Sequence, residues 1–228
     1  MRIVALVPAR GGSVRIPNKN MQTLGELSLV ERKVLQLKQC DIIDEVYVGS
    51  DSDDILEIAI KAGATPIKRN PIACDEALSP ANVMIEDFSK LVNGDIGIWA
   101  HCTNPFIYGR HYKAAISSFL NKYAEGYDSL LSVFRVQSHM WNKYGFPVNY
   151  NPYNHRHTLA KEVDPFFFQD GGIFIQTING FRESKYFFGR KPYLWELDFP
   201  ASFDINTPEE LDFAMAIYEY VDKLENFE

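Results

Sequence analysis

The sequence is poor in cysteine, has fewer basic than acidic residues and lacks a long apolar run. Its three cysteines, Cys40, Cys74 and Cys102, are odd in number and none forms a CxxC pair, which argues against a disulfide framework or a zinc cluster. We therefore expect a reducing, cytoplasmic setting. The 23 Lys and Arg residues against 30 Asp and Glu give a net charge of -7, which disfavours a nucleic acid polymer as partner. No stretch approaches the roughly 18 apolar residues of a membrane helix, so no membrane contact is expected.

The composition is that of a folded globular domain. The chain has 228 residues, of which 46% are hydrophobic, 14% aromatic and 23% charged, and these proportions exclude a disordered or low-complexity protein. A domain usually has roughly 100–200 residues, and no repeat or linker divides this chain. One domain spanning residues 1–228 is therefore expected.

Strand and helix patterns alternate through most of the chain. The apolar, β-branched run Ile3–Val7 is followed by a proline and two glycines, as is typical of a strand buried on both faces. Apolar residues at helical spacing over 26–39, among Arg32 and Lys33, predict an amphipathic helix. Further strands are predicted at 46–49, 64–67, 96–100, 129–134 and 172–175, and further helices around 55–59 and over 80–92, 108–123 and 208–224. This order predicts an α/β fold, a three-layer, Rossmann-like, mostly parallel sheet with right-handed crossovers.

The alternation stops between about 137 and 169, where aromatic residues, prolines and asparagines are concentrated. Two interpretations fit this insertion: a lid or hairpin that packs on the chain's own core, or a dimerisation arm that also lines a substrate pocket. On a monomer, exposed Trp141, Tyr144, Phe146 and Tyr150 would form a larger apolar patch than soluble monomers usually tolerate. We therefore expect a homodimer with its interface centred on 139–168.

The loop after the first predicted strand has the composition of a phosphate-binding loop. Ligands of open α/β sheets bind at the carboxyl ends of the strands, and this loop places Arg10, Arg15 and Lys19 there with Gly11 and Gly12. Glycine lets backbone N–H groups approach an anion closely; the alternative is a solvated basic turn. The loop contains neither GxxxxGK[ST] nor GxGxxG, so the ATPase and dehydrogenase interpretations lose their main support.

Several motifs, taken in chain order, resemble those of one family. Ala9–Ser13 followed by Ile16–Asn20 resembles the pattern ARxGSKxxPxKN of the acylneuraminate cytidylyltransferases, the relatives of CMP-sialic acid synthetase. Further likenesses lie at 49–51, 68–75, 103–105, 169–174 and 203–211, so the resemblance covers nearly the whole chain. It implies an enzyme that transfers CMP from CTP to an acidic sugar and releases pyrophosphate.

The resemblance also implies roles for individual residues. Arg10 and Lys19 would hold the triphosphate as catalytic residues, and Asp204 would ligate Mg²⁺, the implied cofactor, through oxygen. The implied nucleotide-binding residues are Ala9, Gly11, Gly12, Ser13, Arg15, Asn20, Arg69, Asn70 and Ser79. The implied acceptor-binding residues are His101, Thr103, Asn104, Lys143, Arg156, Lys161, Phe167 and Gln169. Of these, Lys143, Arg156 and Lys161 would reach the sugar pocket of a neighbouring subunit.

The sequence departs from the family pattern at the implied metal site. The second aspartate of the family's DID motif is Asn206 here, so the two-carboxylate site is incomplete. Mg²⁺ would bind either through Asp204 and CTP oxygens alone, or with a further carboxylate such as Asp198 or Glu196. Val14 stands where the family has a lysine. The next residue, Arg15, either supplies the positive charge of that lysine or does not.

The largest departure from the family pattern lies in the loop that faces the acceptor sugar in the family. The family's QPTSP loop corresponds to His101–Ile107, and His101 either contacts the acceptor, acts as a base near pH 7, or makes only structural hydrogen bonds. The expected acceptor is a 2-keto-3-deoxy acidic sugar of the sialic, legionaminic, pseudaminic or Kdo type, made for surface polysaccharide. The alternatives are CMP transfer to a phosphonate or phosphorylated small molecule, and a nucleotide-binding module without activity.

Overall fold

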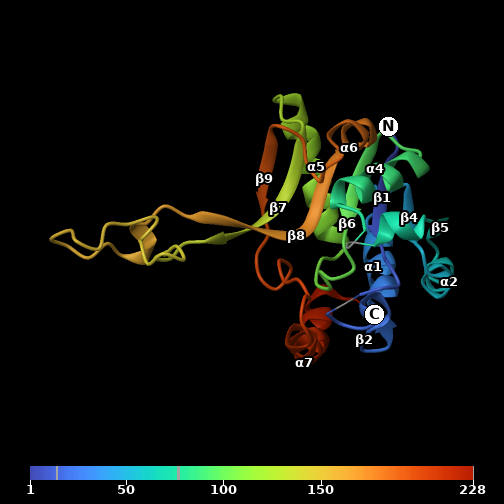
Figure 1. Cartoon of the computed structure of the whole chain (residues 1–228), viewed down its shortest axis with the longest axis horizontal. Coiled ribbons are helices and arrows are strands. Elements are labelled where there is room, and N and C mark those ends of the chain that lie inside the picture. Colours follow the sequence, from blue (N-terminus) through green and yellow to red (C-terminus); the bar gives the residue numbers. More distant parts are fainter. Residues whose placement is uncertain (14, 76–77, 228) are drawn as a thin grey trace.

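The computed structural model describes residues 1–13, 15–75 and 78–227, and it is built on one seven-stranded sheet (Figure 1). The strand order is β5-β4-β1-β6-β8-β7-β9. The strands are β1 Ile3–Pro8, β4 Glu45–Ser50, β5 Thr65–Lys68, β6 Ile96–Ala100, β7 Ser129–Val136, β8 Phe166–Thr177 and β9 Pro192–Glu196. Strand β8 is antiparallel to β6 and β7, and the other neighbouring pairs are parallel. The predicted α/β fold with a mostly parallel sheet is confirmed.

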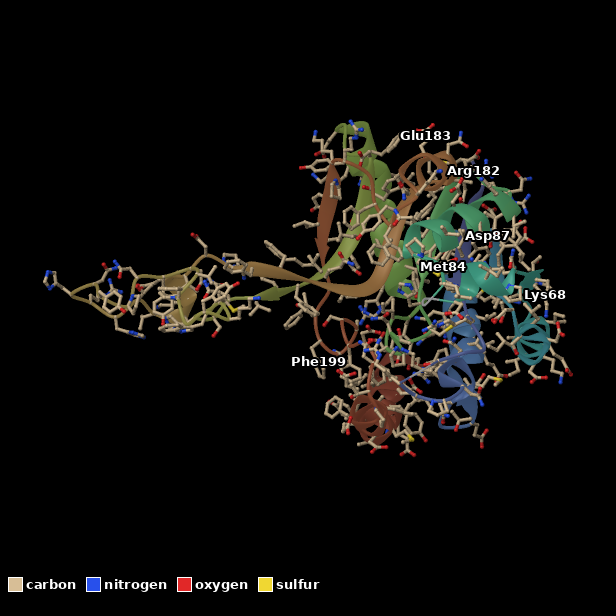
Figure 2. All side chains as sticks on the ribbon, in the orientation of Figure 1. Lys68, Met84, Asp87, Arg182, Glu183 and Phe199 are labelled. Atoms are coloured by element: carbon tan, nitrogen blue, oxygen red, sulfur yellow. The ribbon has the colours of Figure 1, made fainter. Side chains whose placement is uncertain are left out.

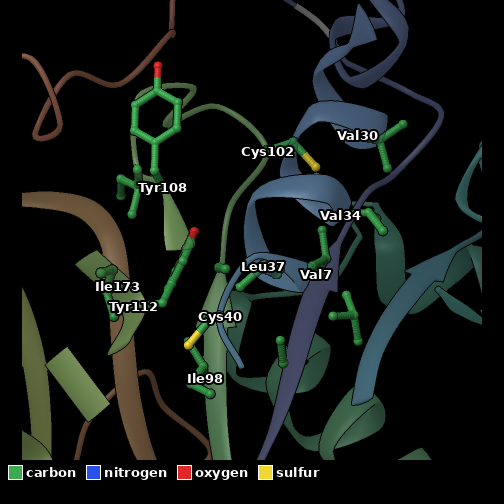
Figure 3. Close-up of a cluster of buried hydrophobic side chains, with 14 of the residues drawn as sticks. Val7, Val30, Val34, Leu37, Cys40, Ile98, Cys102, Tyr108, Tyr112 and Ile173 are labelled. Carbon is green, nitrogen blue, oxygen red and sulfur yellow. The ribbon is translucent and has the colours of Figure 1, made fainter. Parts of the chain in front are cut away.

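Helices cover both faces of the sheet. They are α1 Leu29–Lys38, α2 Asp53–Lys61, α3 Pro71–Cys74, α4 Ala81–Leu91, α5 Gly109–Ala124, α6 Ile178–Ser184 and α7 Pro208–Glu225. Alternate side chains of β1 enter the two cores: Ala5 and Val7 pack with α1, α2, α5 and α7, whereas Val4 and Leu6 pack with α4 and α6. Figure 3 shows the first core, with Val34 of α1 beside Val7. The chain thus forms three layers.

Two local predictions were incomplete. The helix predicted from residue 26 begins at Leu29, because the side chain of Ser28 accepts a hydrogen bond from the backbone N–H of Glu31 and caps it. The preceding residues form a small hairpin of β2 Thr23–Leu24 and β3 Leu27–Ser28. Strand β9 and the short helices α3 and α6 were not predicted, since none has a long periodic pattern.

The insertion at 137–169 is a projecting arm. Strands β7 and β8 continue beyond the sheet and carry the intervening residues, including the 3-10 turn Ala160–Glu162, far from the body of the molecule (Figure 1). Tyr144, Phe146 and Tyr153 are 73%, 64% and 88% exposed, respectively. The arm therefore extends away from the core of the sheet, and some of its rings contact one another, as His139 and Tyr150 do with ring centres 4.4 Å apart.

Two further expectations from the sequence concern the cysteines and a membrane-spanning helix. Cys40, Cys74 and Cys102 are free and buried. None of the helices in the described part of the chain combines the length and apolarity needed to cross a membrane.

The charged face predicted for α1 is buried, contrary to the amphipathic pattern. Arg32 and Lys33 are 1% and 0% exposed, respectively. The guanidinium of Arg32 pairs with the carboxylate of Asp222 on α7, and its Nε donates to the carbonyl oxygen of Pro105 at 2.9 Å. Helix α1 therefore lies between α7 and the loop after β6, and its long polar side chains bond to both.

We predict that Asp222→Asn destabilises the fold. Removing one partner of a buried ion pair leaves Arg32 charged without its counterion, which costs about 3 kcal/mol of unfolding free energy. Urea unfolding measures this, with Asp212→Asn on the exposed face of the same helix as the matched control. Equal unfolding midpoints for the two variants would show that the pair contributes nothing.

Candidate functional site

A cavity of about 390 Å³ opens at the carboxyl ends of β1, β5 and β6. Strands β4 and β6 lie on opposite sides of β1, so the chain reverses direction across the sheet at this point, where open α/β sheets bind ligands. The predicted site residues that line it are Arg10, Ser13, Arg15, Lys19, Asn20, Arg69, Ser79, His101, Thr103 and Asp204. Residues from opposite ends of the chain thus meet at one place.

The loop after β1 is fixed by its own side chains and by the loop after β4. The side-chain amide of Asn20 donates to the carbonyl oxygen of Arg10 at 3.0 Å. The backbone N–H of Gly11 donates to Asp51 Oδ1 at 2.9 Å. A Cβ on Gly11 would lie 3.1 Å from Ser52 Cβ, so glycine allows the two loops to approach this closely. Ala9, Gly11 and Gly12 shape the loop but do not line the cavity; Val14 lies outside the described residues.

The loop after β1 also contacts the segment before α7. Lys19 Nζ donates to the carbonyl oxygen of Ile205 at 3.1 Å, and Arg15 Nη2 donates to Asn206 Oδ1 at 3.2 Å. The amide nitrogen of Asn206 donates in turn to Asp204 Oδ2 at 2.7 Å. The cations of the first loop and the carboxylate of Asp204 therefore face the same cavity.

Asp204 does not cap the last helix. Thr207 does so: its hydroxyl accepts from the backbone N–H of Glu210, and the carboxylate of Glu210 accepts from the backbone N–H of Thr207 in return. Before Asp204, Ala201 and Ser202 form a turn. Asp204 Oδ1 is buried and has no hydrogen-bond donor.

Arg69 belongs to the cavity, whereas its neighbour Asn70 does not. The Arg69 side chain is 1% exposed; its Nε lies 3.1 Å from Asp87 Oδ2 and its Nη2 donates to the carbonyl oxygen of Met84 at 3.0 Å. Both partners lie on α4, which Figure 2 shows beside the body's central strands. The Asn70 side chain accepts from the backbone N–H of Ile72 and caps α3. Asn70 therefore caps α3 in this structure, and its contact with the nucleotide stays a prediction.

Both ring nitrogens of His101 are engaged. Its Nδ1 lies 2.7 Å from the carbonyl oxygen of Gly171, which can only accept, and its Nε2 lies 3.1 Å from the indole nitrogen of Trp99, which can only donate. The ring is therefore the neutral tautomer with its proton on Nδ1, and burial lowers the pKa of His101 below its ordinary value. The geometry favours structural hydrogen bonding over the roles of base or acceptor ligand.

Asn104 is fully buried and does not line the cavity, and its contact with the acceptor stays a prediction. Its amide nitrogen donates to the carbonyl oxygens of Asp170 at 3.0 Å and Phe203 at 3.2 Å. Its backbone carbonyl accepts from Lys33 Nζ at 2.8 Å. Burial lowers the pKa of Lys33 to about 7. Asn104 therefore connects the loop after β6 to β8, to the segment before α7 and to α1.

A second carboxylate, Asp170, lies close to Asp204. Its Oδ1 accepts from Ser132 Oγ at 2.5 Å and from the backbone N–H of Gly172 at 2.8 Å, and its Oδ2 is buried without a donor. Burial raises the pKa of Asp170 to about 6, and the negative charge of Asp204 acts in the same direction. Within the described ranges, no group of three or more His, Cys, Asp and Glu side chains is placed to hold a metal.

The alternative metal ligands named from sequence lie elsewhere. Asp198 and Glu196 line a separate cavity of about 240 Å³ beside Arg110 and Phe199. Neither carboxylate lines the cavity that Asp204 lines. The structure therefore does not bring either of them to the cavity with Asp204.

Five predicted acceptor-binding residues lie on the arm or its stalk. In the arm, the Lys143 ammonium lies 5.0 Å from the Tyr144 ring centre, and Arg156 pairs with Glu162. None of the five lines the cavity of its own chain. Contact of Lys143, Arg156 and Lys161 with a neighbouring subunit stays a prediction, as does acceptor binding by the other two. The five residues are Lys143, Arg156, Lys161, Phe167 and Gln169.

Sequence reasoning missed two features of the site. Phe187 lines the cavity and stacks on Phe174 with ring centres 4.8 Å apart, but nothing in its local sequence distinguishes it. Asp170 had a usable signal, because it is a carboxylate next to a run that was predicted to be a buried strand. A charge at such a position is rare without a partner or a function.

Comparison with known proteins gives a family and a fold. A family model described as cytidylyltransferase matches residues 4–227. N-acylneuraminate cytidylyltransferase of Oncorhynchus mykiss is 30% identical over 187 residues, which are 77% of this chain and 41% of that protein. The corresponding enzyme A of Danio rerio is 27% identical over 157 residues, 66% of this chain and 36% of that protein. The chain thus spans less than half the length of these two relatives.

Other relatives match from end to end. Pseudaminic acid cytidylyltransferase of Campylobacter jejuni subsp. jejuni serotype O:2 is 23% identical over 231 residues, which cover 96% of this chain and 97% of that protein. Among solved structures, CMP:2-keto-3-deoxy-manno-octonic acid synthetase complexed with CTP superposes with a TM-score of 0.69 at 15% identity, covering 96% of this chain and 99% of that one. At this identity the superposition shows the same fold.

We predict that His101 takes up its proton at a lower pH in the folded protein than a histidine does in the unfolded chain. A histidine in an unfolded chain takes up its proton near pH 6.5, so a lowered pKa also means that acidification below about pH 6.5 favours the unfolded state. Nitrogen NMR of the imidazole reports the tautomer and its charge directly. A transition of the His101 signals with a midpoint near pH 6.5 in the folded protein would contradict the hydrogen-bond assignment.

Proposed function

The chain belongs to the cytidylyltransferase family, and on that premise we propose that it transfers CMP from CTP to a 2-keto-3-deoxy acidic sugar and releases pyrophosphate. The sugar is of the sialic, legionaminic, pseudaminic or Kdo type, as the names of the relatives suggest. The observation that carries the proposal is the single cavity lined by Arg10, Lys19 and Asp204 at the carboxyl ends of the parallel strands.

The cations of the cavity suit a triphosphate. Arg10, Arg15 and Lys19 come from one loop and Arg69 from the segment after β5. A unit charge at about 4 Å from a phosphate is worth on the order of 4 kcal/mol at an effective dielectric near 20. Phosphoryl chemistry needs charge stabilisation and positioning more than covalent participation by the protein, so these side chains supply what the reaction requires.

The reaction proceeds in one displacement. A hydroxyl oxygen of the acceptor forms a bond to the α-phosphorus of CTP, the bond from that phosphorus to the bridging oxygen breaks, and pyrophosphate leaves. The hydroxyl proton passes to water, since both nitrogens of His101 are already engaged. Arg10 and Lys19 hold the departing phosphates in line with the attack.

Asp204 fits as an oxygen ligand for Mg²⁺. Its Oδ1 is buried without a donor, and carboxylate oxygen is the ligand that magnesium prefers. When bound, Mg²⁺ neutralises charge on the triphosphate. Asn206 orients Asp204 through its amide nitrogen and adds no negative charge.

The other side of the cavity suits a sugar ring. Phe187 provides an aromatic face, supported by Phe174 and by the edge of the His101 ring. Thr103 adds a hydroxyl. Such a wall, apolar with one polar group, is typical of sites that bind a ring and fix its orientation.

We further propose that the arm forms a homodimer. Tyr144, Phe146 and Tyr153 are exposed at its surface, and soluble monomers rarely expose a contiguous apolar patch of this kind. A second copy of the chain is the simplest partner that would bury these exposed aromatic side chains. It would also bring Lys143, Arg156 and Lys161 to the partner's cavity, where their charge suits the acceptor's carboxylate.

Turnover tests the proposed function. We expect pyrophosphate release from CTP only in the presence of a 2-keto-3-deoxy acidic sugar, and Arg10→Ala should lower kcat/KM for CTP at least about a hundredfold, because a charge-assisted phosphate contact is lost. Arg190→Ala, in a surface cavity away from the site, is the matched control. A panel of acidic sugars, phosphonates and phosphorylated acceptors is assayed with each variant.

Two outcomes would contradict the proposal. Pyrophosphate release with a phosphonate but with none of the acidic sugars would show that the acceptor is a phosphonate. A rise in melting temperature with CTP, but turnover with no acceptor of the panel, would instead identify a nucleotide-binding module.

Light scattering tests the dimer. The wild type should have a mass of about 52 kDa, twice the 26.1 kDa of one chain, and Phe146→Glu in the arm should lower it. Tyr220→Glu, at an exposed aromatic residue of α7, should leave it unchanged. A wild-type mass near that of one chain at micromolar concentration rejects the dimer.

A further inference from the structure

We infer that Asn104 Oδ1, Asp170 Oδ2 and Asp204 Oδ1 form one cation site, with Asp170 as the second carboxylate that the sequence lacks at Asn206. The identity of the cation as the Mg²⁺ of the reaction rests on the proposed function. The site itself rests on the oxygens and can be measured without nucleotide.

Three of the buried oxygens that lack a hydrogen-bond partner belong to residues around Asn104. Buried side-chain atoms without a hydrogen-bond partner in the described residues are Gln36 Oε1, Asn104 Oδ1, Asp170 Oδ2 and Asp204 Oδ1. Such atoms are uncommon in folded proteins and indicate an ion or another bound species. Asn104 bonds to the backbone of Asp170 and of Phe203, which precedes Asp204, so the last three atoms belong to residues held near one another, and we assign them to a single cation.

Hydrogen bonds bring the three side chains together. The amide nitrogen of Asn104 donates to the carbonyl oxygens of Asp170 and of Phe203, the residue before Asp204. The charge of Asp204 acts on Asp170. A Cβ on Gly171, which follows Asp170 and has φ +75, would lie 3.8 Å from Asp204 Oδ2. The backbone of β8 thus passes directly beside the Asp204 carboxylate.

The remaining polar atom of each side chain is already in use. Asp170 Oδ1 accepts from Ser132 Oγ and from the N–H of Gly172, and Asp204 Oδ2 accepts from Asn206 Nδ2. Both nitrogen bonds of Asn104 go to backbone carbonyls. These bonds orient the side chains and leave one oxygen of each for a ligand, which is how supporting hydrogen bonds act at metal sites.

The ligand set defines the class of cation. Two carboxylate oxygens and one amide oxygen, with no thiolate or imidazole nitrogen, suit Mg²⁺, Mn²⁺ or Ca²⁺ and do not suit Zn²⁺. The three come from the loop after β6, from β8 and from the segment before α7. Asn206 then has a definite role: its amide nitrogen holds Asp204 in place, and a carboxylate at that position is not required.

Mn²⁺ binding to the nucleotide-free protein tests the site. Electron paramagnetic resonance of free Mn²⁺ gives the affinity, and Mg²⁺ should displace the bound ion. We expect Asp170→Asn and Asp204→Asn each to weaken Mn²⁺ binding at least about tenfold, while Asp198→Asn, an exposed carboxylate at another cavity, binds as the wild type does. Absence of Mn²⁺ binding by the wild type at millimolar concentration would overturn the site.

Melting in EDTA separates a ligand from a structural residue. In Asp170→Asn the amide oxygen still accepts from Ser132 and Gly172, and the new amide nitrogen can donate to Asp204, so the metal-free melting temperature should stay the same or rise. The rise in melting temperature on adding Mn²⁺ should be lost. A lower melting temperature in EDTA with unchanged Mn²⁺ affinity would show that Asp170 is only structural and would reject the inference.

The outcomes for the site and for the proposed function are independent. If the wild type releases pyrophosphate and Asp170→Asn binds Mn²⁺ as tightly as the wild type, the proposed transferase function stands and the proposed cation site is rejected. If Asp170→Asn loses Mn²⁺ affinity and the wild type does not turn over CTP, the cation site stands and the proposed transferase function is rejected.

Discussion

The position of the site depends on the side-chain amide of Asn104. Its nitrogen donates to carbonyl oxygens in β8 and in the segment before α7, and its own backbone carbonyl accepts from Lys33 of α1. Four segments that are distant in sequence are thereby connected behind the cavity. Asp204 follows one of the bonded carbonyls directly, so the placement of its carboxylate relative to the loop after β1 follows from these bonds. The cavity is therefore built on hydrogen bonds to the backbone as much as on packing.

Buried polar side chains of α1 make this loop possible. A buried loop must find donors for its carbonyl groups, and the loop after β6 finds them in Arg32 and Gln36, which donate to Pro105, and in Lys33, which donates to Asn104. The helix thus presents a charged side to the interior. Asp222 of α7 balances one of these charges, which explains why the last helix packs against the first.

Local patterns in the sequence were enough to predict the first loop and every strand of the sheet except β9. The apolar run of β1 and the basic, glycine-containing segment after it are contiguous. A buried strand followed by an anion-binding loop can therefore be inferred without knowing which distant residues pack against them. Burial of Arg32 and Lys33 and the approach of Asp170 to Asp204 depend on residues that only the fold brings near. The motif at 203–211 marked Asp204 correctly as a residue of the cavity, but not the carboxylate beside it.

A crystal grown with CTP and MnCl₂ tests the central claim most directly. The account predicts the triphosphate against the loop of Arg10 and Lys19, at the carboxyl ends of the parallel strands, and an anomalous manganese peak beside Asp204. A nucleotide bound in the cavity beside Asp198, or at the opposite edge of the sheet, would contradict the account.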